Sequence, residues 1–97
     1  MAVVMIMEWE GVTPGQYDQA RQLVQWDVEP PLGALYHVAA FDGKGLRVTD
    51  VWESAEHFQN FVDSRLMPGV QRVGIQGEPK IEIYPTHIIL APGYNPR

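Results

Sequence analysis

His37 and Asp50 are the residues best suited to chemistry, because a predicted β-hairpin places them opposite each other. The sequence Asp42-Gly43-Lys44-Gly45 is a typical hairpin turn between two apolar segments. With a loop of two or four residues, Phe41 pairs with Leu46, and the imidazole then faces the carboxylate. Such a pair can take up and release a proton, as a general base must. It could equally be a structural pair that satisfies its own hydrogen bonds and fixes the register.

The same register sorts the hairpin side chains onto two faces. Leu35 opposite Trp52 and Ala39 opposite Val48 share the face of the proposed pair, whereas a three-residue loop would mix the two faces. We expect this mainly apolar face to line a cavity, in which Trp52 forms a flat wall for an aromatic ligand or merely fills the core. The opposite face is expected to pack against helices. It carries Tyr36, Val38, Ala40, Thr49 and Val51.

Two residues on other strands are predicted to reach the same cavity and bind substrate. Tyr84 alternates with Ile81 and Ile83 in the last predicted strand, so its side chain can line the pocket. Glu8, near the end of the first predicted strand, is placed at the mouth of the cavity. The alternative for Glu8 is a solvated strand end.

Several kinds of site are excluded by the residues that the chain lacks. Its 97 residues include no cysteine, which rules out disulfides, thiolate metal sites and a cysteine nucleophile. The three histidines are scattered over different elements, so we expect no metal site. Gly43-Lys44-Gly45 is too short for a phosphate-binding loop, and no serine lies in a nucleophile elbow.

Charge and the N-terminal segment restrict the partners and the location. The net charge of −5, without a basic cluster, argues against binding to nucleic acid or to an anionic membrane surface. The apolar residues 1–7 lack a basic leader, and Glu8 ends them well short of the ~20 residues that span a membrane. We therefore expect a cytoplasmic protein.

Periodicity and turn residues predict four strands and two helices. Thr13, followed by Pro14 and Gln16, is typical of a helix start, and Ser54 is a second N-cap. The order βαββαβ predicts a ferredoxin-like α+β domain, in which both helices cover one face of a four-stranded antiparallel sheet. This single domain spans residues 1–97, with residues 91–97 as a loose arm. The strands are expected at Val3–Trp9, Ala34–Phe41, Leu46–Glu53 and Lys80–Tyr84, and the helices from Thr13 to about Gln25 and from Ser54 past Leu66, with an interruption or kink at Pro68-Gly69.

The second face of the sheet is expected to bind another copy of the chain. The chain is 45% hydrophobic, yet a domain of this size buries only roughly 60–65% of its unfolded surface. No further element remains to cover the apolar side chains of that face. We therefore predict a homodimer in which two sheets lie face to face as a closed barrel around the cavity. The alternative is a monomer with an unusually apolar sheet.

Three features resemble the dimeric α/β-barrel superfamily, and in particular its antibiotic-biosynthesis monooxygenase family. They are Tyr36-His37 on the second strand, Val51-Trp52-Glu53-Ser54 leading into a helix, and an Ile- and Pro-rich last strand ending near Ala91-Pro92. Such proteins include cofactor-free oxygenases of polyketide quinones, haem-degrading enzymes, polyketide cyclases and lactone isomerases. The resemblance spans nearly the whole chain. It implies the dimeric barrel and leaves the activity open.

The resemblance also implies which residues contact a substrate. In the quinone-type oxygenases a Trp and a His line the pocket, and they match Trp52 and His37 here. An Asn of those enzymes is Val48 in this chain, and a Tyr is Phe58. Val48 and Phe58 are therefore expected to line the substrate site without the polar groups that hold a phenolic substrate or a reduced-oxygen species.

The resulting hypothesis is a cofactor-independent enzyme acting on an apolar, aromatic or polyketide-like metabolite. No haem is expected, because the haem-binding helix positions of the haem-degrading enzymes fall near Phe61 and Gln71. In an oxygenase, His37 oriented by Asp50 would remove a phenolic proton, and the carbanion would pass an electron to oxygen inside a dry pocket. A cyclase or isomerase would use the same pair beside a carbonyl. The sequence is also compatible with a binding dimer without catalysis, or with a structural dimer without a ligand.

Overall fold

The computed structural model describes residues 1–94 and has the element order expected from the sequence. The strands are β1 (Val3–Glu10), β2 (Ala34–Phe41), β3 (Gly45–Trp52) and β4 (Lys80–Pro85). The helices are α1 (Pro14–Leu23), α2 (Ala55–Phe61), the π-helical segment η1 (Val62–Leu66) and α3 (Met67–Val73). The antiparallel sheet has the strand order β2-β3-β1-β4, which confirms the ferredoxin-like α+β fold.

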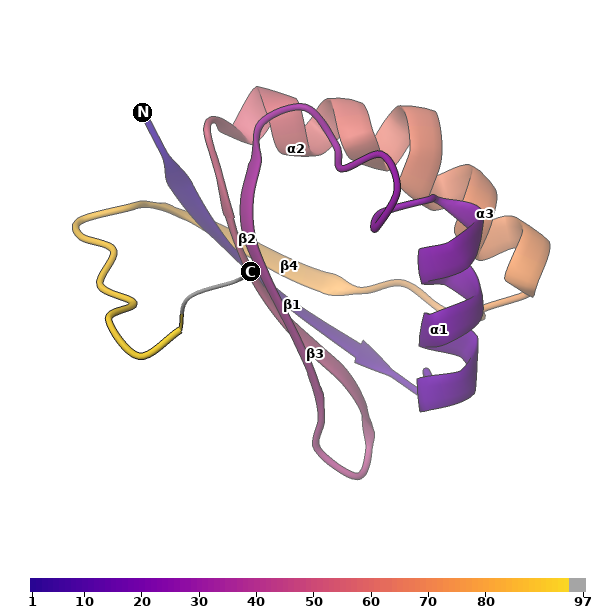
Figure 1. Ribbon diagram of the computed structural model, residues 1–97. Coiled ribbons are helices and arrows are strands. Elements are labelled where there is room, and N and C mark those ends of the chain that lie inside the picture. The colour runs from indigo at the N-terminus through magenta and orange to yellow at the C-terminus, as the bar shows by residue number, and fades with distance from the viewer. Residues whose placement is uncertain (95–97) are drawn as a thin grey trace.

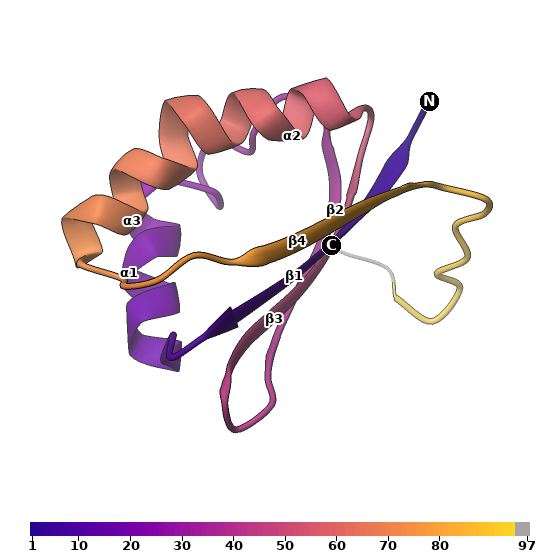
Figure 2. The same cartoon turned by 180° about the vertical axis from the view of Figure 1, so that it is seen from behind.

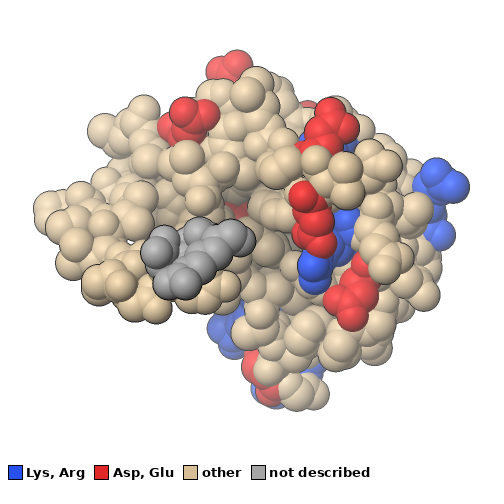
Figure 3. Space-filling model, in the orientation of Figure 1, with Lys and Arg blue, Asp and Glu red and all other residues tan. Residues whose placement is uncertain are grey.

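The helices and the C-terminal segment lie on opposite sides of the sheet. Figures 1 and 2 show α1, α2 and α3 on one face, while the segment that follows β4 runs back along the other side. Figure 3 shows no charged side chain over this segment, which is at the left of the view. Residues 91–94 of the predicted arm contain a turn, and residues 95–97 lie outside the described part of the chain.

The two helix starts are stabilised by the predicted caps. The Thr13 side chain accepts a hydrogen bond from the backbone N–H of Gln16, whose side chain in turn accepts one from the N–H of Thr13. This is the capping box read from the sequence, with Pro14 at the first helical position. The Ser54 hydroxyl accepts from the N–H of His57 and starts α2 in the same way.

The second helical region continues through the predicted interruption, because Pro68 and Gly69 lie within α3. Five residues of π-helix, Val62–Leu66, join α2 to α3, so that Pro68 falls in the first turn of α3. The missing backbone N–H of a proline is tolerated there. A Cβ atom on Gly69 would lie 2.8 Å from Cγ1 of Val24, so glycine allows α3 to pack closely beside the end of α1.

The strand register agrees with the prediction except at one end of the hairpin. Phe41 lies opposite Leu46 and His37 lies opposite Asp50, as expected. The predicted pairing of Leu35 with Trp52 is wrong, because Ala34 is the partner of Trp52 and a β-bulge follows it. The bulge adds one residue to β2, and Leu35 is 53% exposed as a result.

The predicted assignment of the two sheet faces is also wrong. The face of His37 and Asp50 packs against the helices of the same chain. On the opposite face Tyr36 and Val38 are 36% and 45% exposed, although this set was expected to meet the helix layer. The larger apolar side chains of the sheet lie on the face of His37 and Asp50. Burial of apolar surface is favourable by roughly 25 cal/mol for each Å² removed from water, so this face packs against the helices. These larger side chains are Met5, Met7, Trp9, Leu46, Val48 and Trp52.

Candidate active site

A hydrogen-bonded imidazole and carboxylate form the centre of the candidate site. Cross-strand pairing of β2 with β3 brings Nδ1 of His37 to 2.6 Å from Oδ1 of Asp50. The Asp50 side chain is only 4% exposed and that of His37 is 21% exposed. A carboxylate accepts hydrogen bonds when ionised, so this contact places a proton on Nδ1. Nε2 of the neutral ring is then an acceptor.

A tyrosine from the first helix occupies that acceptor. The Tyr17 hydroxyl lies 2.7 Å from Nε2 of His37, and the two rings are parallel within 4°. Burial of the side chain raises the pKa of Tyr17, and the nearby Asp50 carboxylate raises it further, while Arg21 lowers it. At neutral pH Tyr17 is therefore a protonated phenol that donates to His37.

Trp52 lies behind the carboxylate, in the core. Its indole N–H donates to Oδ2 of Asp50 at 3.0 Å, so both carboxylate oxygens are occupied. The Trp52 side chain is fully buried and packs against Phe58 and Phe61. Trp52 is not among the residues that line the cavity described below, whereas Trp26 is, and the Trp26 ring centroid is 4.6 Å from that of His37. In this position Trp52 orients Asp50.

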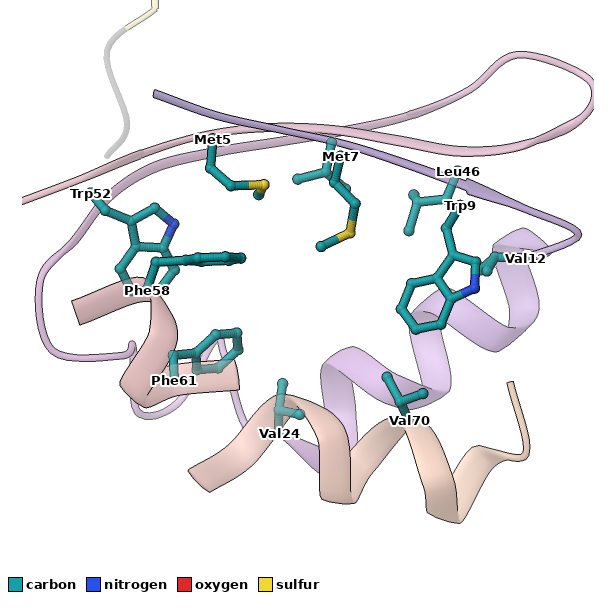
Figure 4. Close-up of a cluster of buried hydrophobic side chains, with 11 residues drawn as sticks. Met5, Met7, Trp9, Val12, Val24, Leu46, Trp52, Phe58, Phe61 and Val70 are labelled. Carbon is teal, nitrogen blue, oxygen red and sulfur yellow. The ribbon is translucent and has the colours of Figure 1, made fainter. Parts of the chain in front are cut away.

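The open sides of Tyr17 and His37 face an apolar cavity between the sheet and the helices. Its volume is about 80 Å³, and Val48 and Phe58, both predicted to line the site, are among its walls. Figure 4 shows side chains of β1 and β3 pointing toward those of α2 and α3 across this space. The polar residues in its wall are Tyr17, Arg21, His37 and Asp50, and the apolar wall includes Met5, Met7, Trp9, Val12, Phe61 and Val70.

A surface cleft lies next to the inner cavity and shares four lining residues with it. Tyr17, Arg21, Trp26 and His37 line both the inner cavity and this cleft, so they separate one from the other. The guanidinium of Arg21 holds the Asp27 carboxylate through three contacts of 2.6–3.1 Å. This ion pair connects α1 to the segment that carries Trp26. These four side chains therefore lie between the inner cavity and the surface cleft.

Glu8 and Tyr84 are far from this arrangement. Met5, Met7 and Trp9 face the helices, so the alternation of β1 directs Glu8 to the opposite face of the sheet. There its carboxylate forms an ion pair of 2.8 Å with Arg47. Tyr84 pairs with Val4 on that same face, and its hydroxyl donates to Glu82 at 2.6 Å. The structure does not bring either residue to His37.

Residues 1–94 contain neither a metal-binding cluster nor a membrane-spanning helix. In that part of the chain no group of three or more His, Asp or Glu side chains is arranged to hold a metal ion. No helix described there is long and apolar enough to cross a membrane.

Comparison with known proteins shows similarity in structure. No protein-family model matches the sequence, and no curated protein matches it. SnoaB, a cofactor-independent oxygenase from Streptomyces nogalater, has a TM-score of 0.63 and 10% identity, with 92% of this chain and 95% of SnoaB covered. A monooxygenase from the gene ActVA-Orf6 of Streptomyces coelicolor, in complex with nanaomycin D, has a TM-score of 0.58 and 20% identity, covering 93% and 91% of the two chains. The chain shares the fold of these two oxygenases.

This fold also occurs in proteins without a known activity. The NE2512 protein of unknown function from Nitrosomonas europaea has a TM-score of 0.67 and 16% identity, with 95% of each chain covered. At such identities the likeness concerns the fold, because one fold carries many functions. The chemistry of this chain must therefore be argued from its own residues.

Sequence reasoning missed Tyr17 and Trp26 as residues of the site. From the sequence alone, periodicity places Tyr17 in the buried stripe of the first helix, and Trp26 is interpreted as a packing residue. One feature of the sequence could have pointed to Tyr17. It places a hydroxyl group in an otherwise apolar helix stripe, which packs against a sheet that carries a histidine. Periodicity alone does not say which helix residue meets which strand residue.

Proposed function

We propose that this protein is a homodimeric, cofactor-independent enzyme that removes a proton from an aromatic ligand, and that it acts as a monooxygenase. The observation that carries the proposal is the pairing of His37 with a buried Asp50 at 2.6 Å beside an apolar cavity. The carboxylate fixes the tautomer and stabilises the imidazolium that forms when a proton is taken up. The fold of two structurally similar oxygenases supports this reading of the site.

The reaction follows from proton removal and from the apolar lining. A hydroxylated aromatic ligand that loses a proton becomes an electron-rich anion, which can reduce molecular oxygen. For an anthrone, the ring methylene and O₂ give the ring carbonyl and water, so no external reductant is needed. The apolar walls exclude water from the anion and from the reduced-oxygen intermediate.

The size of the cavity restricts how a ligand enters. A volume of about 80 Å³ is smaller than the roughly 150 Å³ cavity that holds benzene, so a ring enters only if side chains move. Met5 and Met7 are unbranched and adaptable wall residues. Trp26 stands between the cavity and the surface cleft. These three residues are best placed to make room.

The surface area supports the dimer. The chain exposes 6737 Å², about 1,100 Å² more than the ~5,600 Å² typical of a compact monomer of 11.0 kDa. A standard interface covers about 800 Å² on each partner, which is within this excess. Tyr36 and Val38 on the sheet face away from the helices, and Ile88 and Leu90 of the C-terminal segment beside it, expose apolar side chains that a second copy would cover.

Oxygen consumption with anthrone as the probe tests the activity. The purified protein is expected to convert anthrone to anthraquinone with one O₂ consumed per molecule, at a rate above the spontaneous oxidation. His37→Gln is expected to lower the rate ~10²-fold or more, as loss of a general base does. His87→Gln is the matched control, because His87 is exposed and far from the cavity lining.

The same assay distinguishes the monooxygenase from a binding dimer and from an isomerase or cyclase. Equal rates for the wild-type protein, His37→Gln and buffer would overturn the monooxygenase proposal. Ligand-induced change in tryptophan fluorescence without turnover would then favour a binding dimer. Exchange of the anthrone methylene protons with deuterated water, without oxygen consumption, would favour an isomerase or cyclase that uses the same pair.

A further inference from the structure

We propose that Tyr17, and not His37, is the residue that exchanges a proton with the ligand, while His37 stores that proton and Asp50 positions the imidazole. This inference rests on the proposed function, because it assigns the contact residue of the same site. It makes Tyr17 the catalytic residue of α1 that faces both the inner cavity and the surface cleft.

The imidazole of His37 has no free nitrogen. Asp50 occupies Nδ1 at 2.6 Å, and the Tyr17 hydroxyl occupies Nε2 at 2.7 Å. Trp26 covers the ring at a centroid distance of 4.6 Å. A ligand in the cavity therefore cannot reach a basic nitrogen of His37 without breaking the contact with Tyr17. The Tyr17 oxygen, by contrast, still has an acceptor position after donating its own proton.

The tyrosine is also fixed in place for this transfer. The phenol and imidazole rings are parallel within 4° with centroids 6.1 Å apart, and the edge of Phe41 packs against the phenol at 6.2 Å. The hydroxyl is thereby aligned with Nε2 before a ligand binds. Preorganised geometry of this kind lowers the entropic cost of proton transfer.

The proton path balances without any further group. The ligand O–H or C–H proton moves to the Tyr17 oxygen as the Tyr17 proton moves to Nε2 of His37. The ligand becomes an anion, the imidazole becomes an imidazolium, and its Nδ1–H stays on the Asp50 carboxylate. No bond between heavy atoms is broken, and the net charge of the site is unchanged.

The charged groups around Tyr17 suit a proton donor and acceptor that is neutral at rest. Arg21 lies on the same helix and is paired with Asp27, so its charge is partly compensated. Asp18 and Asp50 also act on the phenol. Together with burial, these carboxylates keep the pKa of Tyr17 above its usual 10.0. The phenol therefore keeps its proton at rest, and gives it to His37 only when a ligand supplies another proton to the Tyr17 oxygen.

The test uses 4-nitrophenol, a single-ring probe whose ionised form absorbs at a longer wavelength than the neutral form. We expect the wild-type protein to increase the ionised fraction of the bound probe. Tyr17→Phe keeps the ring stack and removes only the hydroxyl, so it is expected to bind the probe within about 3-fold of wild type and to ionise at least ~10-fold less of it. Tyr84→Phe, on the opposite face of the sheet, is the matched control and should behave as wild type.

Two results would overturn the inference. One is a Tyr17→Phe protein that ionises the bound probe as well as the wild type does, since His37 would then act directly. The other is a wild-type protein that binds the probe entirely in its neutral form. A double variant, Tyr17→Phe with His37→Gln, should be no worse than either single variant, because residues that act as one unit are not additive.

The outcome is distinguishable from that of the proposed function. If anthrone is not oxidised but bound nitrophenol is ionised in a Tyr17-dependent manner, the monooxygenase assignment is wrong and the proton relay stands. If anthrone is oxidised equally well by wild type and Tyr17→Phe, the monooxygenase assignment stands and the role of Tyr17 is wrong.

Discussion

Replacement of Asp50 by asparagine separates the positioning of His37 from the stability of the core. The carboxylate accepts from two donors, Nδ1 of His37 at 2.6 Å and the indole N–H of Trp52 at 3.0 Å. An amide has one oxygen and one NH₂ group, so it can accept from only one of them. The indole is only a donor, so the amide oxygen goes to Trp52. The NH₂ group then faces Nδ1, and the ring must change its tautomer to Nε2–H.

The two consequences differ in size. A hydrogen bond to a charged group contributes about 1.5–3 kcal/mol and a neutral one about 0.5–1.5 kcal/mol. Part of this loss is offset, because a buried carboxylate no longer has to be desolvated. We expect Asp50→Asn to lower the free energy of unfolding by about 1–3 kcal/mol. The effect on the reaction rate is expected to be larger, because an Nε2–H ring cannot accept a proton from Tyr17. We expect the rate to fall ~10²–10⁴-fold, which corresponds to an increase of about 3–5 kcal/mol in activation free energy.

Urea unfolding and the nitrophenol assay measure the two effects on the same protein. Asp63→Asn is the matched control, because Asp63 is exposed and its carboxylate accepts a hydrogen bond from the Gln59 side chain at the surface. This variant should change the free energy of unfolding by less than ~0.5 kcal/mol. Nitrogen-15 NMR of the His37 ring should show the proton on Nδ1 in the wild type and on Nε2 in Asp50→Asn. An Asp50→Asn protein with wild-type probe ionisation and an unchanged tautomer would refute the reasoning.

Three more outcomes follow from the structure. Val48→Lys places a charge in the apolar cavity wall, where Val48 is buried, so the protein should lose several kcal/mol of stability or fail to fold; wild-type urea unfolding would contradict the position of this residue. A hydrogen bond from the backbone N–H of Lys44 and one from the Arg47 guanidinium lower the pKa of Asp42 from 3.8 to about 2, so the contribution of Asp42 to stability should be complete above pH ~4 and lost as the pH falls toward 2. Wild type should therefore lose its advantage over Asp42→Asn in that interval, and parallel pH profiles would exclude the effect. Sedimentation at micromolar concentration should give about twice the chain mass of 11.0 kDa, and a single-chain mass there would count against the dimer.

Local rules were sufficient to predict the elements and most of the register. The capping box at Thr13 and the hairpin turn at Asp42 depend on residues within a few positions, and both occur as predicted. The opposition of His37 and Asp50 follows directly from that turn. The bulge after Ala34 could not be predicted from the turn, because it lies at the far end of the hairpin, where the Glu53 N–H donates to the Gly33 carbonyl and joins the incoming loop to the end of β3.

The choice of sheet face failed because it requires the whole sheet. Considered alone, the hairpin has apolar side chains on both faces. The decision comes from β1, whose Met5, Met7 and Trp9 face the helices and are buried together with Trp52. Apolar area is summed over all strands when a sheet packs, so two strands do not determine the outcome. Glu8 lies on the face away from the helices, paired with Arg47, and it is separated from His37 because His37 faces the helices.

That correction changes how the site relates to the dimer. If His37 had faced the second sheet, the chemistry would have needed two subunits to enclose it. Instead its contacts come from Tyr17, Trp26 and Asp50 of the same chain, and the cavity beside it is lined by this chain's own helices. The second face of the sheet can then bind a partner without entering the reaction. The proposed proton transfer and the proposed dimerisation are therefore separable, and a single-chain particle would still contain the Tyr17, His37 and Asp50 side chains of the proposed relay.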